Sequence, residues 1–211
     1  IYGLVQRAAS TGKTSAPVRF CVPSGNFGNL TAGVYAWQWG LAVEGFIAAT
    51  NINDVVPEYL ATGTFRPRLS VQTLSNAMDV GDPSNFERLL AVFHGDAAAM
   101  RAVIQGERVS DEETRDTIRR AYEERGLLVD PHTAVGLRAA ERYRSRMGFS
   151  GDLIVLATAH PRKFPEIVRE AAGAAPELPP ALAAVMDLHK RSVPIEPDAG
   201  KLKGFLLARY L

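Results

Sequence analysis

Short apolar runs alternate along this chain with longer segments in which apolar residues recur every three or four positions. Three runs, at 18–22, 45–50 and 152–158, have the length and composition expected of buried strands. The longer segments, of which 30–41 is the first, are typical of helices that bury one face. Strands joined through helices pair in parallel, so the pattern predicts an open, mainly parallel α/β sheet with helices on both faces. The unbroken apolar run at 152–158 predicts a central strand covered on both sides.

Capping residues indicate where the helices begin. Serine followed three residues later by glutamate predicts a capping box at Ser84–Glu87 and another at Ser110–Glu113. Aspartates are predicted at the N-cap of three further helices, at Asp54, Asp96 and Asp130. The helix after Asp96 is predicted to run to Gln105.

The pattern predicts one α/β domain between two shorter segments. Residues 1–16 have the spacing of the end of a helix and then a polar linker, and a chain that opens in this way is expected to continue from an N-terminal part that it lacks. The domain is predicted over 17–172, and a C-terminal helical extension over 173–211. Gly12-Lys13-Thr14 is not interpreted as a nucleotide-binding P-loop, because Arg7 occupies the position of its upstream glycine.

The composition is that of an ordinary globular protein, with 46% hydrophobic and 22% charged residues. A formal net charge of +1 favours neither nucleic acid nor an anionic membrane as a partner. No apolar run reaches the roughly 18 residues of a membrane span. Cys21 is the single cysteine and cannot form an internal disulfide, so a reducing compartment such as the cytoplasm is expected. No metal site is predicted.

The segment from Pro23 to Gly33 carries a pattern typical of phosphate binding. It joins the first strand to the first helix through a turn with two glycines and two asparagines, residues that adopt positive φ at low cost. Such a turn points main-chain N–H groups into one concavity, next to the positive end of the helix, and this arrangement binds phosphate. The alternative is a plain connecting turn, in which Asn29 caps the helix and Gly33 lets it pack closely on the sheet.

Ligands of open parallel sheets bind beyond the carboxyl ends of the strands. Three predicted turns lie at that edge, at Ser24–Asn29, Asn51–Asp54 and Thr158–Pro161. The first offers main-chain donors, and the last offers a hydroxyl and the imidazole of His160. The segment 64–81 has no regular period, and irregular segments of this length are often functional.

These residues resemble the threonine synthase family, whose members are pyridoxal-phosphate enzymes of the tryptophan synthase β-like fold (fold type II). The stretch 23–33 is similar to the family's cofactor-phosphate loop. Further stretches resemble the family in the same order, namely 46–54 with Pro57, 74–80, 83–90 and 158–164. The resemblance extends from about residue 17 to about residue 170 and indicates the C-terminal part of such an enzyme.

The resemblance implies a lyase that converts O-phospho-L-homoserine and water into L-threonine and phosphate, with pyridoxal 5'-phosphate as its cofactor. Thr158 would lie against the pyridine nitrogen, where a neutral hydroxyl leaves that nitrogen largely unprotonated. The implied ligands of the cofactor phosphate, mostly through main-chain N–H groups, are Ser24, Gly25, Asn26, Phe27, Gly28 and Asn29.

The same resemblance places the family's Schiff-base lysine in the N-terminal part that this chain lacks. We therefore expect no catalytic residue here, and a chain that alone is inactive and binds the cofactor weakly or not at all. Lys163 lies in the wrong region for that lysine. His132 and His160 are interpreted as structural. Asn76 and Asp79 are candidates to line the site, and Asp79 is equally open to a role in stabilising its loop.

Two alternatives remain open at this point. One is another fold type II enzyme, such as a serine/threonine dehydratase or a cysteine synthase, because these enzymes have related glycine loops. The other is a non-catalytic phosphate-binding module. The pattern predicts no oligomeric state.

Overall fold

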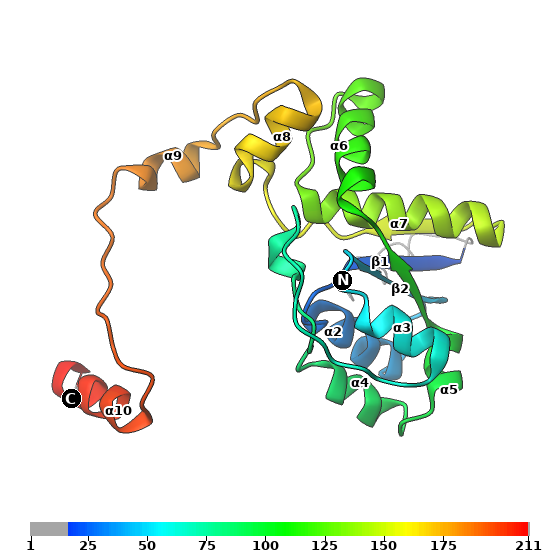
Figure 1. Ribbon diagram of the computed structural model, residues 1–211, viewed down its shortest axis with the longest axis horizontal. Coiled ribbons are helices and arrows are strands. Elements are labelled where there is room, and N and C mark those ends of the chain that lie inside the picture. Colours follow the sequence, from blue (N-terminus) through cyan, green and yellow to red (C-terminus); the bar gives the residue numbers. More distant parts are fainter. Residues whose placement is uncertain (1–16, 211) are drawn as a thin grey trace. The chain divides into compact units, whose positions relative to one another are not determined.

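The computed structural model describes residues 17–210, so the predictions made for residues 1–16 lie outside the described part. The chain divides into two units, of which the first ends at Pro176 and the second begins at Glu177. The first unit contains the sheet (Figure 1). None of the described helices is both long enough and apolar enough to cross a membrane.

Four strands form one sheet among the described residues: β1 (Val18–Pro23), β2 (Gly45–Thr50), β3 (Ile104–Arg108) and β4 (Asp152–Val155). Their order across the sheet is β3-β2-β1-β4, and every neighbouring pair is parallel. β1 and β2 are the central strands, and all of their residues are buried. The predicted open parallel sheet is thereby confirmed.

Helices cover both faces of this sheet (Figure 1). α7 (Pro131–Met147) packs on one face, α6 (Asp111–Arg125) packs on α7, and α8 (Pro165–Ala172) packs on α6. The opposite face carries α2, α3, α4 and α5, which span Gly28–Gln38, Val55–Thr62, Phe86–Val92 and Ala97–Val103.

Successive residues of the central strands alternate between the two layers of the core. In β1, Phe20 and Val22 join the cluster on the α2 side, and Cys21 joins the cluster on the α7 side. Gly33 of α2 lies directly against Phe46 of β2, because a Cβ on Gly33 would come 2.8 Å from the Cε1 atom of that ring. The predicted close packing at Gly33 is confirmed.

β3 is a strand that the apolar pattern does not predict. Its sequence, IQGER, contains one glycine and three polar side chains, so it forms no apolar run. α5 is predicted to continue to Gln105 but ends at Val103, because the chain becomes extended at Ile104 and pairs with β2. Gly106 fits under α3, where a Cβ would come 2.8 Å from the Cα atom of Pro57. Pairing with a buried neighbour therefore decides this strand, and local composition does not record that pairing.

β4 is an edge strand of the described sheet, not the central strand that its apolar run predicts. Among the described strands it pairs with β1 alone, and it ends at Val155. Ile154 is exposed, and Leu153 and Val155 are half-buried. An apolar run shows that a strand can be buried, but it does not show how many neighbours the strand has.

Several predicted helix caps are confirmed. The capping box of Ser110–Glu113 is present at the start of α6. The carboxylate of Asp96 accepts hydrogen bonds from two main-chain N–H groups at the start of α5, and that of Asp130 accepts one at the start of α7. These helices begin where the sequence predicts, because the caps satisfy N–H groups that have no partner inside the helix.

The predictions of the other two helix caps are wrong. The Ser84–Glu87 box does not form, because α4 begins at Phe86 and the Ser84 hydroxyl is hydrogen-bonded to Asn26. Asp54 precedes α3, but its carboxylate pairs with Arg68 and accepts no capping hydrogen bond. In both cases a partner distant in sequence engages the side chain that would have capped the helix.

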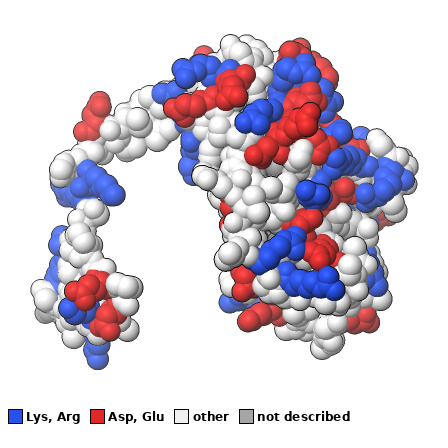
Figure 2. Space-filling view, in the orientation of Figure 1, with Lys and Arg blue, Asp and Glu red and all other residues white. Residues whose placement is uncertain are grey.

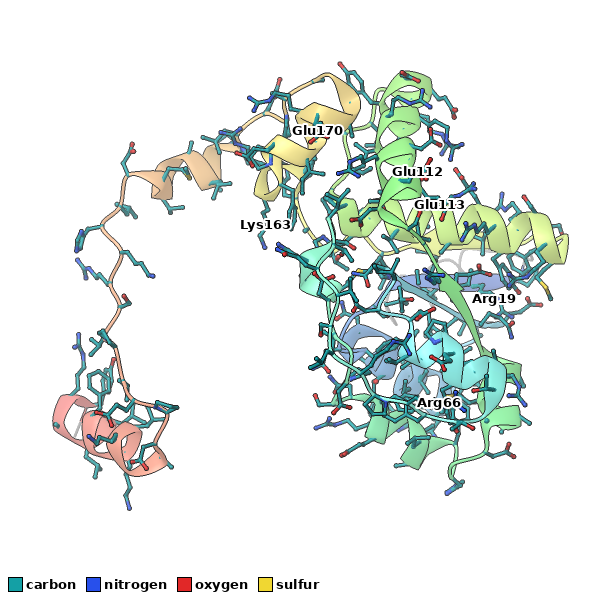
Figure 3. All side chains as sticks on the ribbon, viewed as in Figure 1. Arg19, Arg66, Glu112, Glu113, Lys163 and Glu170 are labelled. Carbon is teal, nitrogen blue, oxygen red and sulfur yellow. The ribbon has the colours of Figure 1, made fainter. Side chains whose placement is uncertain are left out.

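Positive and negative side chains are interspersed on the face of the first unit seen in Figure 2. An example is Glu113 of α6, labelled in Figure 3, which pairs with Arg138 and Arg142 of α7. The second unit contains α9 (Pro180–Met186) and α10 (Ala199–Tyr210), whose side chains are largely exposed.

Candidate functional site

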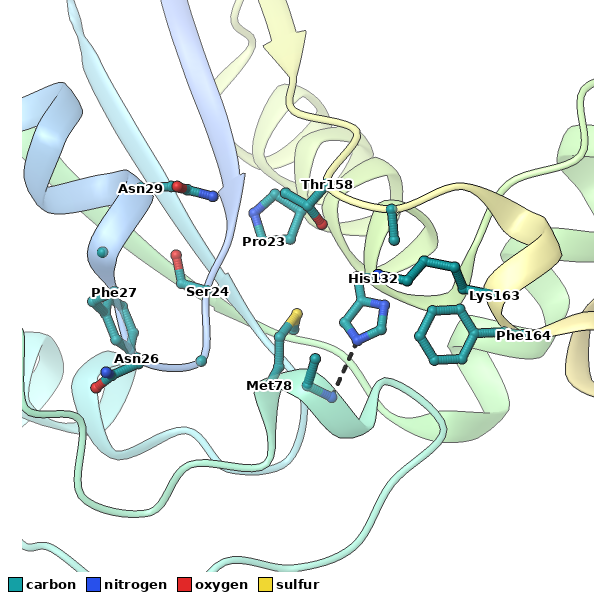
Figure 4. A pocket seen from close by; sticks show the side chains of 14 residues that line it. Pro23, Ser24, Asn26, Phe27, Asn29, Met78, His132, Thr158, Lys163 and Phe164 are labelled. Atoms are coloured by element: carbon teal, nitrogen blue, oxygen red, sulfur yellow. Dashed lines mark hydrogen bonds between the residues drawn. The ribbon is translucent and has the colours of Figure 1, made fainter. Parts of the chain in front are cut away.

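A cavity of about 290 Å³ opens at the carboxyl ends of β1 and β4 (Figure 4). Its wall is formed by the turn between β1 and α2, the short 3-10 helix η1 (Asn76–Met78), the start of α7, and the segment between β4 and α8. All seven residues predicted to bind the cofactor line this cavity. The lining also includes Ala77, Met78, His132, Lys163 and Phe164, which the sequence did not assign to a site.

The turn before α2 contains a left-handed residue, but this residue is Phe27 (φ 62°). Neither Gly25 nor Gly28 has positive φ, so the prediction that the glycines and asparagines supply it is wrong. The ring of Phe27 is buried in the core, and its carbonyl accepts hydrogen bonds from the N–H and the hydroxyl of Thr31. These contacts offset the roughly 1–2 kcal/mol that a left-handed conformation costs. α2 begins at Gly28, so Asn29 is not its N-cap.

Gly25 is required for close approach and not for its φ angle. A Cβ on Gly25 would come 2.5 Å from the Cα atom of Met78 and 3.1 Å from the carbonyl oxygen of Ala77. The main chain of the turn therefore rests directly on η1, and a side chain at position 25 would push the two segments apart.

The side chains of Ser24 and Asn26 are engaged within the protein. The Ser24 hydroxyl donates to the carbonyl of Val22 at 2.9 Å, and the Ser24 N–H donates to the carbonyl of Ala49 at 2.8 Å. The Asn26 side chain is hydrogen-bonded to the hydroxyl of Ser84 at 3.1 Å. These bonds fix both ends of the turn and leave its main chain to face the cavity.

The main-chain N–H groups of residues 25–29 donate no hydrogen bond to any described residue, although the N–H groups of Ser24 and Thr31 both do. Free N–H groups at a helix start, together with the positive end of the helix dipole, form a binding site for an anion. We call residues 25–29 the cradle.

Thr158 lies on the other side of the cavity from the cradle. It follows β4 and is exposed, and Figure 4 shows its side chain facing the cavity, near Pro23. The structure thus brings together the first and the last of the three predicted turns.

Lys163 is a cavity residue that sequence reasoning set aside. It closes the short helix η2 (Pro161–Lys163), and its side chain extends towards His132 (Figure 4). The Nδ1 atom of His160 accepts a hydrogen bond from the N–H of Arg162 at 3.1 Å, so His160 caps η2, in agreement with its predicted structural role. The sequence signal that could have identified Lys163 as a cavity residue is its nearness to Thr158.

His132 forms the floor of the cavity and is buried together with Asp130. Its Nδ1 atom lies 2.7 Å from a carboxylate oxygen of Asp130, and its Nε2 atom lies 3.2 Å from the N–H nitrogen of Ala77. Burial acts to raise the pKa of Asp130, but hydrogen bonds from His132 and Thr133 outweigh burial and hold this pKa below its ordinary value.

The turn at Asn51–Asp54 does not line the cavity. The side-chain amide of Asn51 donates to Asp79 at 2.8 Å and to Thr73 at 2.9 Å, and the N–H and hydroxyl of Thr73 also donate to Asp79. This polar network holds the irregular segment that carries η1. Asp79 therefore stabilises the loop, and neither Asp79 nor Asn76 lines the cavity.

The chain matches two protein-family models. One, described as "Pyridoxal-phosphate dependent enzyme", matches residues 5–159, and the other, described as "Threonine synthase, C-terminal", matches residues 133–206. The resemblance inferred from the sequence motifs is thereby confirmed.

Similar curated proteins include the threonine synthases of Serratia marcescens and Escherichia coli, which are 43% and 40% identical to this chain over 186 residues. Each match covers 88% of this chain and 42% of the relative. The chain thus spans less than half the length of the curated relatives that it matches.

Solved structures agree with this likeness. Threonine synthase from Brucella melitensis with bound pyridoxal phosphate has a TM-score of 0.77 at 37% identity, covering 89% of this chain and 45% of that one. Yeast threonine synthase has a TM-score of 0.78 at 34% identity, covering 86% of this chain and 45% of that one. A fungal L-serine ammonia-lyase from Rhizomucor miehei, with a TM-score of 0.56 at 15% identity, shares the fold alone.

Proposed function

The chain belongs to the family of pyridoxal-phosphate-dependent enzymes, and from this premise we propose that its cradle binds the phosphate group of pyridoxal 5'-phosphate. The observation that carries the proposal is the run of N–H groups at residues 25–29, which border the cavity and donate to no described residue. A phosphate dianion suits such donors, because it accepts several hydrogen bonds and is stabilised by the helix dipole. The missing side chain at Gly25 lets the cradle rest on η1.

The remaining lining suits the ring of the cofactor. We place the Thr158 hydroxyl beside the pyridine nitrogen, where a neutral partner leaves that nitrogen largely unprotonated. The bound cofactor supplies an electron sink for carbanions. The work of this chain is to bind the phosphate and to orient the ring, and the lysine that joins the cofactor aldehyde is expected from outside this chain.

The proposed activity of the whole enzyme is that of a threonine synthase, which converts O-phospho-L-homoserine and water into L-threonine and phosphate. Support comes from threonine synthase relatives at 34–43% identity, against 15% for the fungal serine ammonia-lyase. This chain, as the C-terminal part, is expected to be inactive alone. A reducing compartment such as the cytoplasm suits its free, buried Cys21.

Binding to the cradle is tested by titrating the ¹⁵N-labelled chain with pyridoxal phosphate or inorganic phosphate up to millimolar concentration. The amide signals of residues 25–29 should shift first and most, even where affinity is weak. Gly25→Ala should abolish the response, because its Cβ would clash with the main chain of Met78. Gly204→Ala is the matched control, because nothing lies within 4 Å of a Cβ there. Shifts centred on any other segment would contradict the proposal.

The reaction is tested with a chimera in which this chain replaces the C-terminal part of Escherichia coli threonine synthase. We expect release of phosphate from O-phospho-L-homoserine and no deamination of L-serine. Deamination of L-serine without phosphate release would favour a dehydratase instead. A chimera that binds pyridoxal phosphate but transforms neither substrate would leave only the binding role.

A further inference from the structure

We infer that His132 is a positioning residue for the cradle: it holds η1 in place through a hydrogen bond from Ala77, and η1 in turn sets where Gly25 can lie. The inference deepens the proposed function, because it takes the cradle as the phosphate site, but the hydrogen-bond chain itself is independent of any ligand. It gives the buried Asp130–His132 pair a role beyond capping α7.

The contacts determine which nitrogen of the imidazole carries the proton. The N–H of Ala77 can only donate, so the Nε2 atom of His132, 3.2 Å away, must accept. The proton therefore sits on Nδ1, which donates to the carboxylate of Asp130 at 2.7 Å. Both nitrogens are engaged, so the ring has no free site at which to take a proton from a ligand. This histidine positions its neighbours and does not act as a base.

Asp130 keeps the ring in this orientation. Its carboxylate also accepts the main-chain N–H of His132 at 2.9 Å and the hydroxyl of Thr133, and it is fully enclosed. A carboxylate with three hydrogen-bond donors is held firmly, so the imidazole that it grips has one orientation.

The held ring controls two parts of the cavity wall. η1 has three residues and little stability of its own, so the bond from Ala77 to His132 restrains it. Met78, the next residue, limits how closely Gly25 can approach η1, because its Cα atom would lie only 2.5 Å from a Cβ on Gly25. On its other side the His132 ring packs on Phe164, with ring centroids 4.9 Å apart. Movement of the His132 ring would therefore displace η1, on which the cradle rests.

Two variants of similar size separate this role from simple packing. In His132→Gln the side-chain oxygen can occupy the place of Nε2 and still accept from Ala77. In His132→Asn the amide can occupy the place of Nδ1 and bond Asp130, but it is too short to reach Ala77. We compare amide hydrogen exchange at Ala77, the amide chemical shift of Gly25, and inorganic phosphate titrations followed at the cradle amides.

For His132→Asn we expect exchange at Ala77 to accelerate about tenfold, the effect of losing one hydrogen bond, with a shifted Gly25 amide signal and several-fold weaker phosphate affinity. His132→Gln should stay within about twofold of the unchanged chain in Ala77 exchange and phosphate affinity, because it keeps an acceptor for the N–H of Ala77. Equal acceleration of Ala77 exchange in the two variants, or an unchanged Gly25 amide chemical shift in His132→Asn, would overturn the inference.

A further measurement needs no variant. Imidazole ¹⁵N signals of the unaltered chain report the tautomer of His132, and a proton found on Nε2 would also overturn the inference. A different outcome is that hydrogen exchange follows the expected pattern while the cradle amide signals do not shift when phosphate is added. That combination would refute the proposed cofactor role and leave the positioning role intact.

Discussion

The Asn26 side chain and the Ser84 hydroxyl are hydrogen-bonded at 3.1 Å, although 58 residues separate them in sequence. The bond ties the cradle to the turn before α4. It also explains why Ser84 does not cap that helix, since its hydroxyl is already engaged.

Ser84→Ala should weaken phosphate binding by the chain about two- to threefold while costing only about 0.5 kcal/mol of stability, because the bond is exposed to solvent. Phosphate titration and urea unfolding measure the two effects. Ser145→Ala, at an exposed position of α7, is the control and should change neither. Equal phosphate affinities for Ser84→Ala and the control would show that the hydrogen bond between Asn26 and Ser84 does not contribute to phosphate binding.

Gly33→Ala should destabilise the first unit by about 1–3 kcal/mol, because the added methyl would come 2.8 Å from the Phe46 ring in a packed core. This cost exceeds the gain of about 1 kcal/mol that alanine brings to a helix over glycine. Thermal and urea unfolding measure the difference. Gly204→Ala in α10 meets no neighbour and should not destabilise the chain, so a similar loss in both variants would argue against crowding.

The Cys21 thiol should not react with thiol reagents at pH 8 while the chain is folded. Burial raises its pKa well above the ordinary range, and its Sγ atom donates to the carbonyl of Gly136 at 3.1 Å. In denaturant the same thiol should react at once. Reagent uptake that is equally fast with and without denaturant would mean that β1 opens readily.

Asp130→Asn should change how stability depends on pH. The pKa of Asp130 is lowered in the folded chain, so its contribution is present above the unfolded pKa, near 4, and is lost as pH falls through the folded value. We expect Asp130→Asn to be about 1.5–3 kcal/mol less stable at pH 7, the usual value of hydrogen bonds to a charged group. Below pH 4 the two unfolding curves should converge, and a constant gap would contradict this.

Lys163→Met should weaken the binding of inorganic phosphate about two- to fivefold at low ionic strength, because an exposed ammonium attracts an anion only modestly. The difference should shrink in high salt, where exposed charges are screened. Lys163→Arg keeps the charge and should bind like the unchanged chain. A loss that persists in high salt would mean that Lys163 contacts the anion directly.

The sequence by itself determined the strand–turn–helix unit and the caps at Ser110, Asp96 and Asp130, and it predicted the turn at 25–29 as a candidate for phosphate binding. These features are local. Apolar spacing, glycine content and capping side chains act within one or two turns of chain, so they can be recognised without knowing what lies opposite.

Tertiary structure alone decided the features that depend on a distant partner. β3 is a strand because β2 lies beside it, and Ser84 caps nothing because Asn26 engages it. Gly25 must be glycine because Met78 approaches it. Likewise His132 reaches the cavity floor only once α7 has packed on the sheet. Such contacts join residues that lie far apart in sequence. A pattern of neighbouring residues therefore does not show that they meet in the folded chain.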